Sequence, residues 1–288
     1  MPAARGGIEL VLSHFCIRHA SFDERVAAAA ASGVSQIGLQ YRSYEELRAA
    51  GATPASLRAV LDRHGVRVSE LEVLRPWAAD ERGKAAAARA ERSVMEMAET
   101  FGARCVQVIG PCPADLDHAA EVLAVLCDRV AEVGLVVGVE FLPFTNIADA
   151  GVALDLVLRT GRDNAGICVD SWHHVRGAND WSLLERLPPE RIVAVQLNDG
   201  PLVPEDPDYL TDCLSNRRVL GEGAFDLRRL VDLLRLRGVT VPLSMEVIST
   251  RLDELPPGEA VRRIVEGARA LLGVEPLEPV EPEVGPGR

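Results

Sequence analysis

Residues 165–177 read AGICVDSWHHVRG and join a short apolar run to a dense group of polar side chains. The run has the apolar and β-branched character of a buried strand. It ends in the carboxylate of Asp170, although apolar strands commonly end in turn formers such as Gly, Asn or Pro. Two of the chain's six histidines follow at once, as His173 and His174. This strand end is therefore the first candidate for a site that carries chemistry.

Apolar runs of the same kind recur along the chain, and segments of helical periodicity separate them. The eight strand-like runs span residues 8–12, 35–40, 66–73, 103–109, 135–141, 165–170, 191–197 and 241–247. The helix-like segments span residues 21–32, 54–64, 79–101, 115–132, 147–160, 181–187, 226–237 and 258–272. Regular alternation of strand and helix implies parallel strands joined by crossover helices, and eight such units fit a single (β/α)8 barrel. We predict this α/β barrel over residues 1–273, followed by an extended or disordered Pro/Glu-rich tail over residues 274–288.

A doubly wound sheet is the alternative fold for such alternation. It requires a Gly-rich phosphate-binding loop after the first strand. The sequence there, LVLSHFCIRHASF (residues 10–22), contains no glycine. The barrel is therefore favoured.

The composition disfavours several kinds of partner. The net charge is −12, from 43 acidic and 31 basic residues. Such a chain is repelled by phosphate backbones and anionic lipid, so we expect neither a nucleic-acid nor a membrane partner. No apolar run reaches the roughly 20 residues of a membrane span, and no signal peptide is expected before the first strand. The six cysteines form no CxxC pair and are expected to be the reduced thiols of a cytoplasmic protein.

The last four predicted strands end in polar side chains, namely Glu140, Asp170, Gln196 and Glu246. In a parallel barrel these ends meet at one mouth, and adjacent strands lie about 4.8 Å apart. Three carboxylates and an amide oxygen form a hard donor set, which favours Mn²⁺ or Mg²⁺ and leaves Co²⁺ or Zn²⁺ as alternatives. We therefore predict that these four residues hold one divalent metal ion. The alternative for any one of them is a solvated or salt-bridged side chain.

The motifs around these residues resemble those of the xylose-isomerase-like TIM barrel superfamily. This superfamily includes sugar phosphate isomerases and epimerases, inosose dehydratase, dehydroshikimate dehydratase and endonuclease-IV-like proteins. The matching segments are GVEFLPF with Glu140, DSWH with Asp170 and His173, QLND with Gln196, and SMEV with Glu246. The resemblance implies a TIM barrel and metal ligation by the four strand-end residues. Gln196 departs from the family pattern, in which His is commoner, and this departure disfavours zinc.

The resemblance also implies which side chains meet the substrate. RRVLGEGAFD matches an Arg-x-x-Gly-x-Gly-x-x-Asp segment that begins at Arg218, so Arg218 is expected to bind substrate. His173, three residues after Asp170, is expected to reach a substrate oxygen; the alternative is a buried histidine packed among aromatic side chains. His14 and Trp77 follow predicted strands and are expected to line the substrate pocket, with a structural role as the alternative for each.

These residues together predict a reaction type. A divalent ion on oxygen ligands can clamp a carbonyl and the adjacent hydroxyl, which lowers the cost of an enediolate. Glu140 and Glu246 are expected to approach the α-carbon from opposite sides, so that one removes a proton while the other returns it or protonates a leaving hydroxyl. His173 is the third catalytic candidate. We predict a metal-dependent isomerase or epimerase that works by α-proton abstraction through a metal-bound enediolate on a small-molecule sugar, keto-sugar or cyclitol.

Three other functions are alternatives to the isomerase or epimerase. A lyase of the inosose dehydratase or dehydroshikimate dehydratase type shares the first chemical step and is the main alternative. An endonuclease-IV-like phosphodiesterase is disfavoured because histidines are scarce on the strands and the net charge is negative. A non-catalytic binding protein is disfavoured because both glutamates and the Asp–His pair are present. The exact substrate and the oligomeric state, a homo-oligomer included, are left open.

Overall fold

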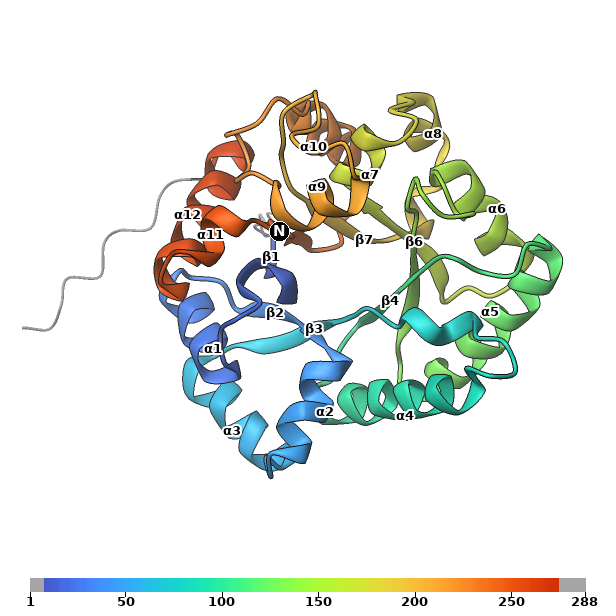
Figure 1. The fold of residues 1–288 in the computed structure, drawn as a ribbon, viewed down its shortest axis with the longest axis horizontal. Helices are drawn as coiled ribbons and strands as arrows, with labels where there is room; N and C mark the ends of the chain where they lie inside the picture. Colours follow the sequence, from blue (N-terminus) through green and yellow to red (C-terminus); the bar gives the residue numbers. More distant parts are fainter. Residues whose placement is uncertain (1–7, 275–288) are drawn as a thin grey trace, which may run out of the picture.

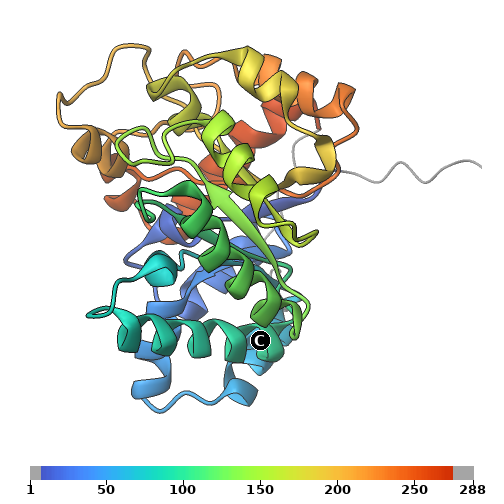
Figure 2. The ribbon, with the colours of Figure 1, turned by 90° about the vertical axis from the view of Figure 1, so that its right-hand side faces the viewer.

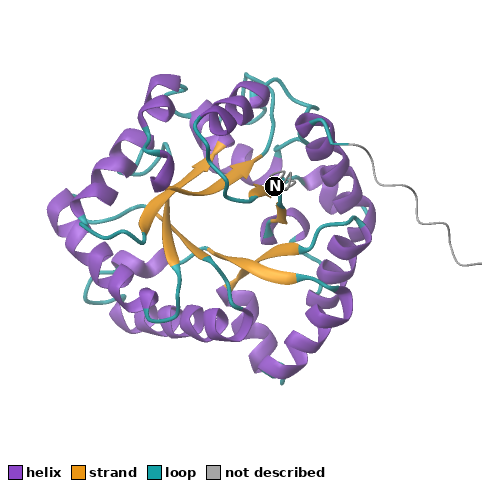
Figure 3. Ribbon diagram, turned by 180° about the vertical axis from the view of Figure 1, so that it is seen from behind, coloured by secondary structure: helices purple, strands orange, loops and turns teal. Residues whose placement is uncertain are grey.

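The computed structural model describes residues 8–274, which form a closed barrel of eight parallel strands. Each strand pairs with the next one in the chain, and the last pairs with the first, as Figures 1 and 3 show from opposite sides. The strands are β1 (Leu10–Leu12), β2 (Gln36–Gln40), β3 (Arg67–Glu72), β4 (Cys105–Ile109), β5 (Val136–Glu140), β6 (Ala165–Asp170), β7 (Ile192–Leu197) and β8 (Leu243–Met245). The predicted (β/α)8 barrel is confirmed, and every predicted strand is present.

Helices surround the strands in a ring (Figure 1). They are α1 (Phe22–Ala31), α2 (Tyr41–Ala49), α3 (Pro54–His64), α4 (Lys84–Phe101), α5 (Leu116–Ala131), α6 (Ala150–Arg159), α7 (Ser171–Arg176), α8 (Trp181–Arg186), α9 (Tyr209–Ser215), α10 (Leu227–Leu236), α11 (Thr250–Asp253) and α12 (Pro257–Leu272), with the 3₁₀ turns η1 (His14–Ile17), η2 (Arg75–Ala78) and η3 (Pro189–Arg191). Local sequence fixes several helix ends. Ser21 and Glu24 form a capping box at the start of α1, and Gly102 ends α4 with a φ of 67°.

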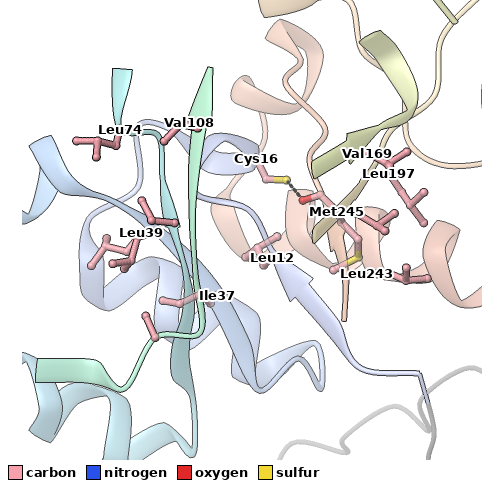
Figure 4. Close-up of a cluster of buried hydrophobic side chains, with 14 of the residues drawn as sticks. Leu12, Cys16, Ile37, Leu39, Leu74, Val108, Val169, Leu197, Leu243 and Met245 are labelled. Atoms are coloured by element: carbon pink, nitrogen blue, oxygen red, sulfur yellow. Dashed lines mark hydrogen bonds between the residues drawn. The ribbon is translucent and has the colours of Figure 1, made fainter. Parts of the chain in front are cut away.

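Side chains alternate between the two faces of each strand. One set packs outward against the helices and makes the apolar core, part of which Figure 4 shows around Leu12, Ile37, Val169 and Met245. The other set points into the barrel and is largely polar, as the hydrogen bond from Gln107 to Glu70 across β4 and β3 illustrates (3.2 Å). Buried polar side chains therefore fill much of the barrel interior up to the mouth where the strands end.

The connections at the carboxyl ends of the strands build the mouth. The longest one joins β7 to β8, carries α9 and projects on the left of Figure 2 in gold and orange. The six cysteines are all free, in agreement with the expectation of reduced thiols. Among residues 8–274, no helix is long and apolar enough to cross a membrane. Residues 275–288, which make up nearly all of the predicted tail, lie outside the described residues.

Candidate active site

The four predicted ligands lie at the same end of the barrel. Glu140, Asp170 and Gln196 lie on β5, β6 and β7, and Glu246 directly follows β8. In the strand register, Glu140 pairs with Cys168 and Asp170 pairs with Gln196. All four side chains are buried, with at most 5% of any residue exposed. The topology thus brings together side chains from four strands, as the sequence predicts.

His173 is held over Asp170 by the start of α7. Oδ1 of Asp170 accepts the backbone N–H groups of Trp172 (2.6 Å) and His173 (3.2 Å), so this carboxylate is the N-cap of the helix. The first turn then directs the His173 ring toward β5, where Nε2 lies 3.0 Å from Oε1 of Glu140. This capping geometry is the physical reason for an Asp-x-x-His spacing at the end of a strand.

Three of these residues form a compact donor set. Glu140, Asp170 and His173 each offer one ligand atom, and the three atoms lie within 4.8 Å of one another. Two carboxylates and one imidazole suit a divalent cation. The set differs from the predicted one, because it includes His173 and does not include Glu246.

The amide of Gln196 is engaged on both sides. Its Nε2 donates to Oε1 of Glu246 (3.0 Å), and its Oε1 accepts from the thiol of Cys168 (3.1 Å). The oxygen that the sequence analysis assigned to the metal therefore faces a thiol. A half-turn of the amide exchanges the two contacts and presents the oxygen toward Glu246. Ligation by Gln196 stays a prediction that requires this rotation.

Arg217 supplies positive charge at the mouth. Its Nη1 lies 2.8 Å from Oε2 of Glu246 and 3.1 Å from Oδ2 of Asp170, and the residue is 2% exposed. Burial alone would raise the pKa of Asp170, but the guanidinium and His173 hold that pKa below its usual range. Burial raises the pKa of Glu246 well above its usual value, with Arg217 opposing the rise and the other carboxylates adding to it. The site therefore concentrates carboxylates around one internal cation.

The neighbouring Arg218 is the residue that the sequence predicts to bind substrate. Its Nη2 lies 2.6 Å from Oε1 of Glu205, outside the acidic cluster, and its side chain is 27% exposed. A backbone bridge between Asp199 and Arg218 sets this orientation, because consecutive residues of an extended segment point to opposite sides. Only the bridge tells which arginine faces inward, and the sequence alone shows no such signal. A substrate-binding role for Arg218 stays a prediction.

His14 and Trp77, the other predicted substrate-binding residues, contact neither Glu140 nor Asp170. The His14 ring faces Ser43 on α2, with Nε2 3.1 Å from Oγ, and lines a cavity of about 320 Å³ that α1 and α2 border. Burial, with help from Arg25, lowers the pKa of His14 to about 3, so the ring is neutral. The Trp77 indole N–H donates to the carbonyl of Ile109 (2.8 Å). Both have the surroundings of structural residues, and their pocket roles stay predictions.

Two polar residues after β7 organise the mouth. Asn198 donates from Nδ2 to both oxygens of Asp170 (3.1 and 3.2 Å). The Asp199 carboxylate accepts backbone N–H groups from Gly221, Gly223 and Phe225 and so shapes the loop before α10. A Cβ at Gly223 would lie 2.1 Å from Oδ1 of Asp199, which explains the glycine there. The Gly-x-Gly segment is thus built around Asp199.

Two further contacts were not predicted. The hydroxyl of Tyr209, on α9, lies 2.6 Å from Nδ1 of His173 and therefore fixes the ring from the side opposite Glu140. On the other side of the mouth, Glu72 ends β3 as a buried carboxyl group that meets Ser13 and the backbone of His14. Glu72 could have been predicted as a site residue, because it is a Glu at the end of a predicted strand. Nothing in the sequence near Tyr209 indicates that it contacts the site.

Curated enzymes resemble this chain over part of their length. A 3-dehydroshikimate dehydratase from Pseudomonas aeruginosa is 31% identical over 192 residues, which cover 65% of this chain and 29% of the relative. The chain thus spans less than a third of that protein. An inosose isomerase from Bacillus velezensis is 28% identical over 204 residues, which cover 67% of this chain and 71% of the relative.

A similar solved structure and a matching family model agree with the resemblance to these relatives. A crystal structure of an IolI protein with a bound zinc atom superposes with a TM-score of 0.83 at 19% identity, covering 92% of this chain and 98% of that one. The model of the family described as xylose isomerase-like TIM barrel matches residues 26–271. The match spans most of the barrel and all four strand-end residues, so the chain belongs to the xylose isomerase-like TIM barrel family.

Proposed function

We propose that this protein is a divalent-metal-dependent isomerase or epimerase of a sugar or cyclitol ketone. The observation that carries the proposal is the compact group of Glu140, Asp170 and His173 at the buried mouth, with Glu246 directly after β8 at the same end of the barrel. The curated relatives named above are enzymes by name, a 3-dehydroshikimate dehydratase and an inosose isomerase. We favour an inosose as the substrate, because the match to the inosose isomerase covers most of both chains.

The donor set fits a divalent cation, which Glu140, Asp170 and His173 would hold, together with Glu246 and Gln196 if the amide rotates. Bound there, a cation of this kind supplies Lewis acidity to a ketone oxygen and its neighbouring hydroxyl. We favour Mn²⁺ or Mg²⁺ because carboxylate oxygens dominate the set. Zn²⁺ and Co²⁺ are the alternatives that the His173 nitrogen favours.

The residues of the chain divide the proton transfer between them. Glu246 is proposed to take the proton from the carbon next to the ketone, and its burial increases the basicity needed for this step. Glu140, paired with His173 at 3.0 Å, is proposed to return a proton on the other face. Arg217 holds the carboxylates of Glu246 and Asp170 in place, and Tyr209 holds the ring of His173. Burial of all these groups keeps bulk water from the reacting carbon.

A dehydratase is the second candidate, and the match to the 3-dehydroshikimate dehydratase favours it. It shares the proton abstraction and differs in the next step, in which the carbon–oxygen bond of a β-hydroxyl breaks and the oxygen leaves as water. A carboxylate substrate requires a cation to bind it. The described cation at the mouth, Arg217, is already engaged by Glu246 and Asp170, so we rank this candidate below the isomerase.

A product assay separates the two candidates. Metal-loaded protein is incubated with an inosose or with 3-dehydroshikimate, and the products are followed by NMR. We expect a rearranged ketone of unchanged mass from the inosose and no turnover of 3-dehydroshikimate. Loss of water from 3-dehydroshikimate, with the inosose unchanged, would favour the dehydratase instead.

A further inference from the structure

Four apolar side chains pack together at the mouth, in a cluster separate from the core that packs against the helices. We call this cluster the apolar wall; its members are Phe15, Val73, Ile109 and Leu142. Val73, Ile109 and Leu142 are 5%, 6% and 5% exposed, and Phe15 is partly buried. Each lies at or just after the carboxyl end of a strand, namely β1, β3, β4 or β5. The mouth therefore has an apolar part besides its carboxylates.

The apolar wall borders the donor set of Glu140, Asp170 and His173. Ile109 pairs with Glu140 in the register of β4 and β5, and adjacent strands lie about 4.8 Å apart. Ile109 follows Gln107 by two residues, so it points into the barrel as Gln107 does. In a closed barrel of eight strands in sequential order, β2 lies across from β6, and the wall also draws on the ends of β1 and β3, the neighbours of β2. The apolar wall thus extends from beside Glu140 to the side of the mouth that faces Asp170.

The backbone of the apolar wall has its carbonyl groups occupied. The carbonyl of Val73 accepts a backbone N–H (2.9 Å), and that of Ile109 accepts the indole N–H of Trp77 (2.8 Å). The carbonyl of Leu142 accepts both the N–H and the hydroxyl of Thr145 (2.9 and 3.0 Å). A ligand hydroxyl placed against the apolar wall loses its hydrogen bonds to water, and the apolar side chains offer none in return. The apolar wall therefore favours a ligand group without a hydroxyl.

A six-membered ring would contact both parts of the mouth. The donor set is proposed above to hold the ketone oxygen and the hydroxyl next to it through a metal ion. The ring carbon opposite the ketone then points away from the donor set, across the mouth and toward the apolar wall. In an inosose this carbon carries a hydroxyl group. A ring that lacks this hydroxyl fits the apolar wall better than a ring that has it.

We propose that the preferred substrate is a deoxyinosose, a cyclitol ketone without a hydroxyl on the ring carbon opposite the ketone, and that the apolar wall selects it. This inference rests on the function proposed above and narrows its substrate. A pocket of apolar side chains discriminates against an added hydroxyl by about 10–100-fold. The value of kcat/KM should therefore be higher for the deoxyinosose than for the inosose by about 10–100-fold in metal-loaded protein.

The two ends of β3 supply a variant and its matched control. Val73→Thr keeps the shape of the side chain and places a hydroxyl in the apolar wall, whereas Val66→Thr makes the same change at the opposite end of β3. Both valines are 5% exposed, so the two substitutions should have similar effects on stability. Val73→Thr should reduce the preference for the deoxyinosose by about 2–10-fold, because its hydroxyl can pair with that of the inosose.

The assay measures kcat/KM for both ketones by NMR in wild type and the two variants. Val66→Thr should keep the wild-type preference. A wild-type preference for the inosose would overturn the inference. So would a preference that Val73→Thr and Val66→Thr change equally.

A second readout does not depend on turnover. In protein with isotope-labelled methyl groups, excess deoxyinosose should shift the NMR signals of Val73, Ile109 and Leu142 and leave those of Val66 in place. Unshifted signals from the apolar wall would overturn the inference, even where both ketones react. Shifted signals without reaction of either ketone would support the apolar wall as a binding site and would show that the proposed function fails.

Discussion

Removal of Arg217 is predicted to destabilise the metal-free protein strongly. The guanidinium pairs with Asp170 and Glu246 in a site from which solvent is excluded, and the arginine is 2% exposed. Removing one partner of a buried ion pair leaves uncompensated charge and costs about 3–5 kcal/mol. We therefore expect Arg217→Met to lower the free energy of unfolding by about 3–5 kcal/mol in the presence of a chelator.

The adjacent arginine provides a matched control. The side chains of Arg218 and Glu205 are 27% and 30% exposed, and pairs near the surface contribute about 0–1 kcal/mol. Arg218→Met should therefore have a small effect. Urea unfolding followed by circular dichroism measures both variants. Equal destabilisation by the two would refute the assignment of Arg217 as the internal cation of the site.

Bound metal should reduce the loss of stability that Arg217→Met causes. A ligand that binds only the folded state at 100 times its Kd adds about 2.7 kcal/mol of stability. A divalent cation between Asp170 and Glu140 also restores positive charge next to the carboxylates that Arg217 leaves behind. We expect the loss in Arg217→Met to be smaller in excess Mn²⁺ than in chelator. An identical loss of stability under both conditions would show that the metal ion does not bind next to Asp170 and Glu140.

Three further predictions concern single residues. Asp170→Ala should abolish metal binding, measured by metal analysis of protein purified without chelator; unchanged metal content would remove Asp170 from the site. Gln196→His should shift the metal preference toward Zn²⁺ or Co²⁺, and an unchanged preference would make Gln196 a neighbour of the metal. Since the pKa of His14 falls from 6.5 to about 3 on folding, its contribution to stability is complete above pH 6.5 and is lost as pH falls toward 3. Between pH 7 and pH 5, wild type should therefore lose about 2 kcal/mol of unfolding free energy that His14→Gln does not lose, measured by urea unfolding at both pH values.

The architecture was predictable because the local sequence of each strand is enough to identify it. Runs such as LVVGVEF and RIVAVQL are apolar and β-branched, and glycines or prolines separate them from the helices. Four helices, α2, α7, α9 and α11, were not predicted, and each has nine residues or fewer. The α2 helix follows β2 without a linker, and its N-cap, Gln40, makes no side-chain capping bond. The α9 helix has only seven residues, about two turns, which is too short for a helical period to stand out in the sequence.

The candidate site was predictable where chemistry coincides with a strand end. Glu140, Asp170 and Glu246 lie where the topology alone places them, and capping by Asp170 fixes His173. The inward arginine was not predictable, since Arg217 and Arg218 are adjacent and only the bridge to Asp199 orients them. The contacts of Tyr209 with His173 and of Glu72 with Ser13 join residues 36 and 59 positions apart, and such pairings depend on loop geometry that no local pattern encodes.

The central claim is that Glu246 and Glu140 move protons at the carbon beside a ketone. Entry of solvent deuterium into an inosose, followed by NMR with metal-loaded wild type, Glu246→Gln and Glu140→Gln, tests it most directly. Each substitution keeps the shape of the side chain and removes its basicity. We predict exchange in wild type and a loss of about 10²–10⁴-fold in Glu246→Gln, with Glu140→Gln also impaired. Exchange at the wild-type rate in both variants would contradict it and leave His173 as the base.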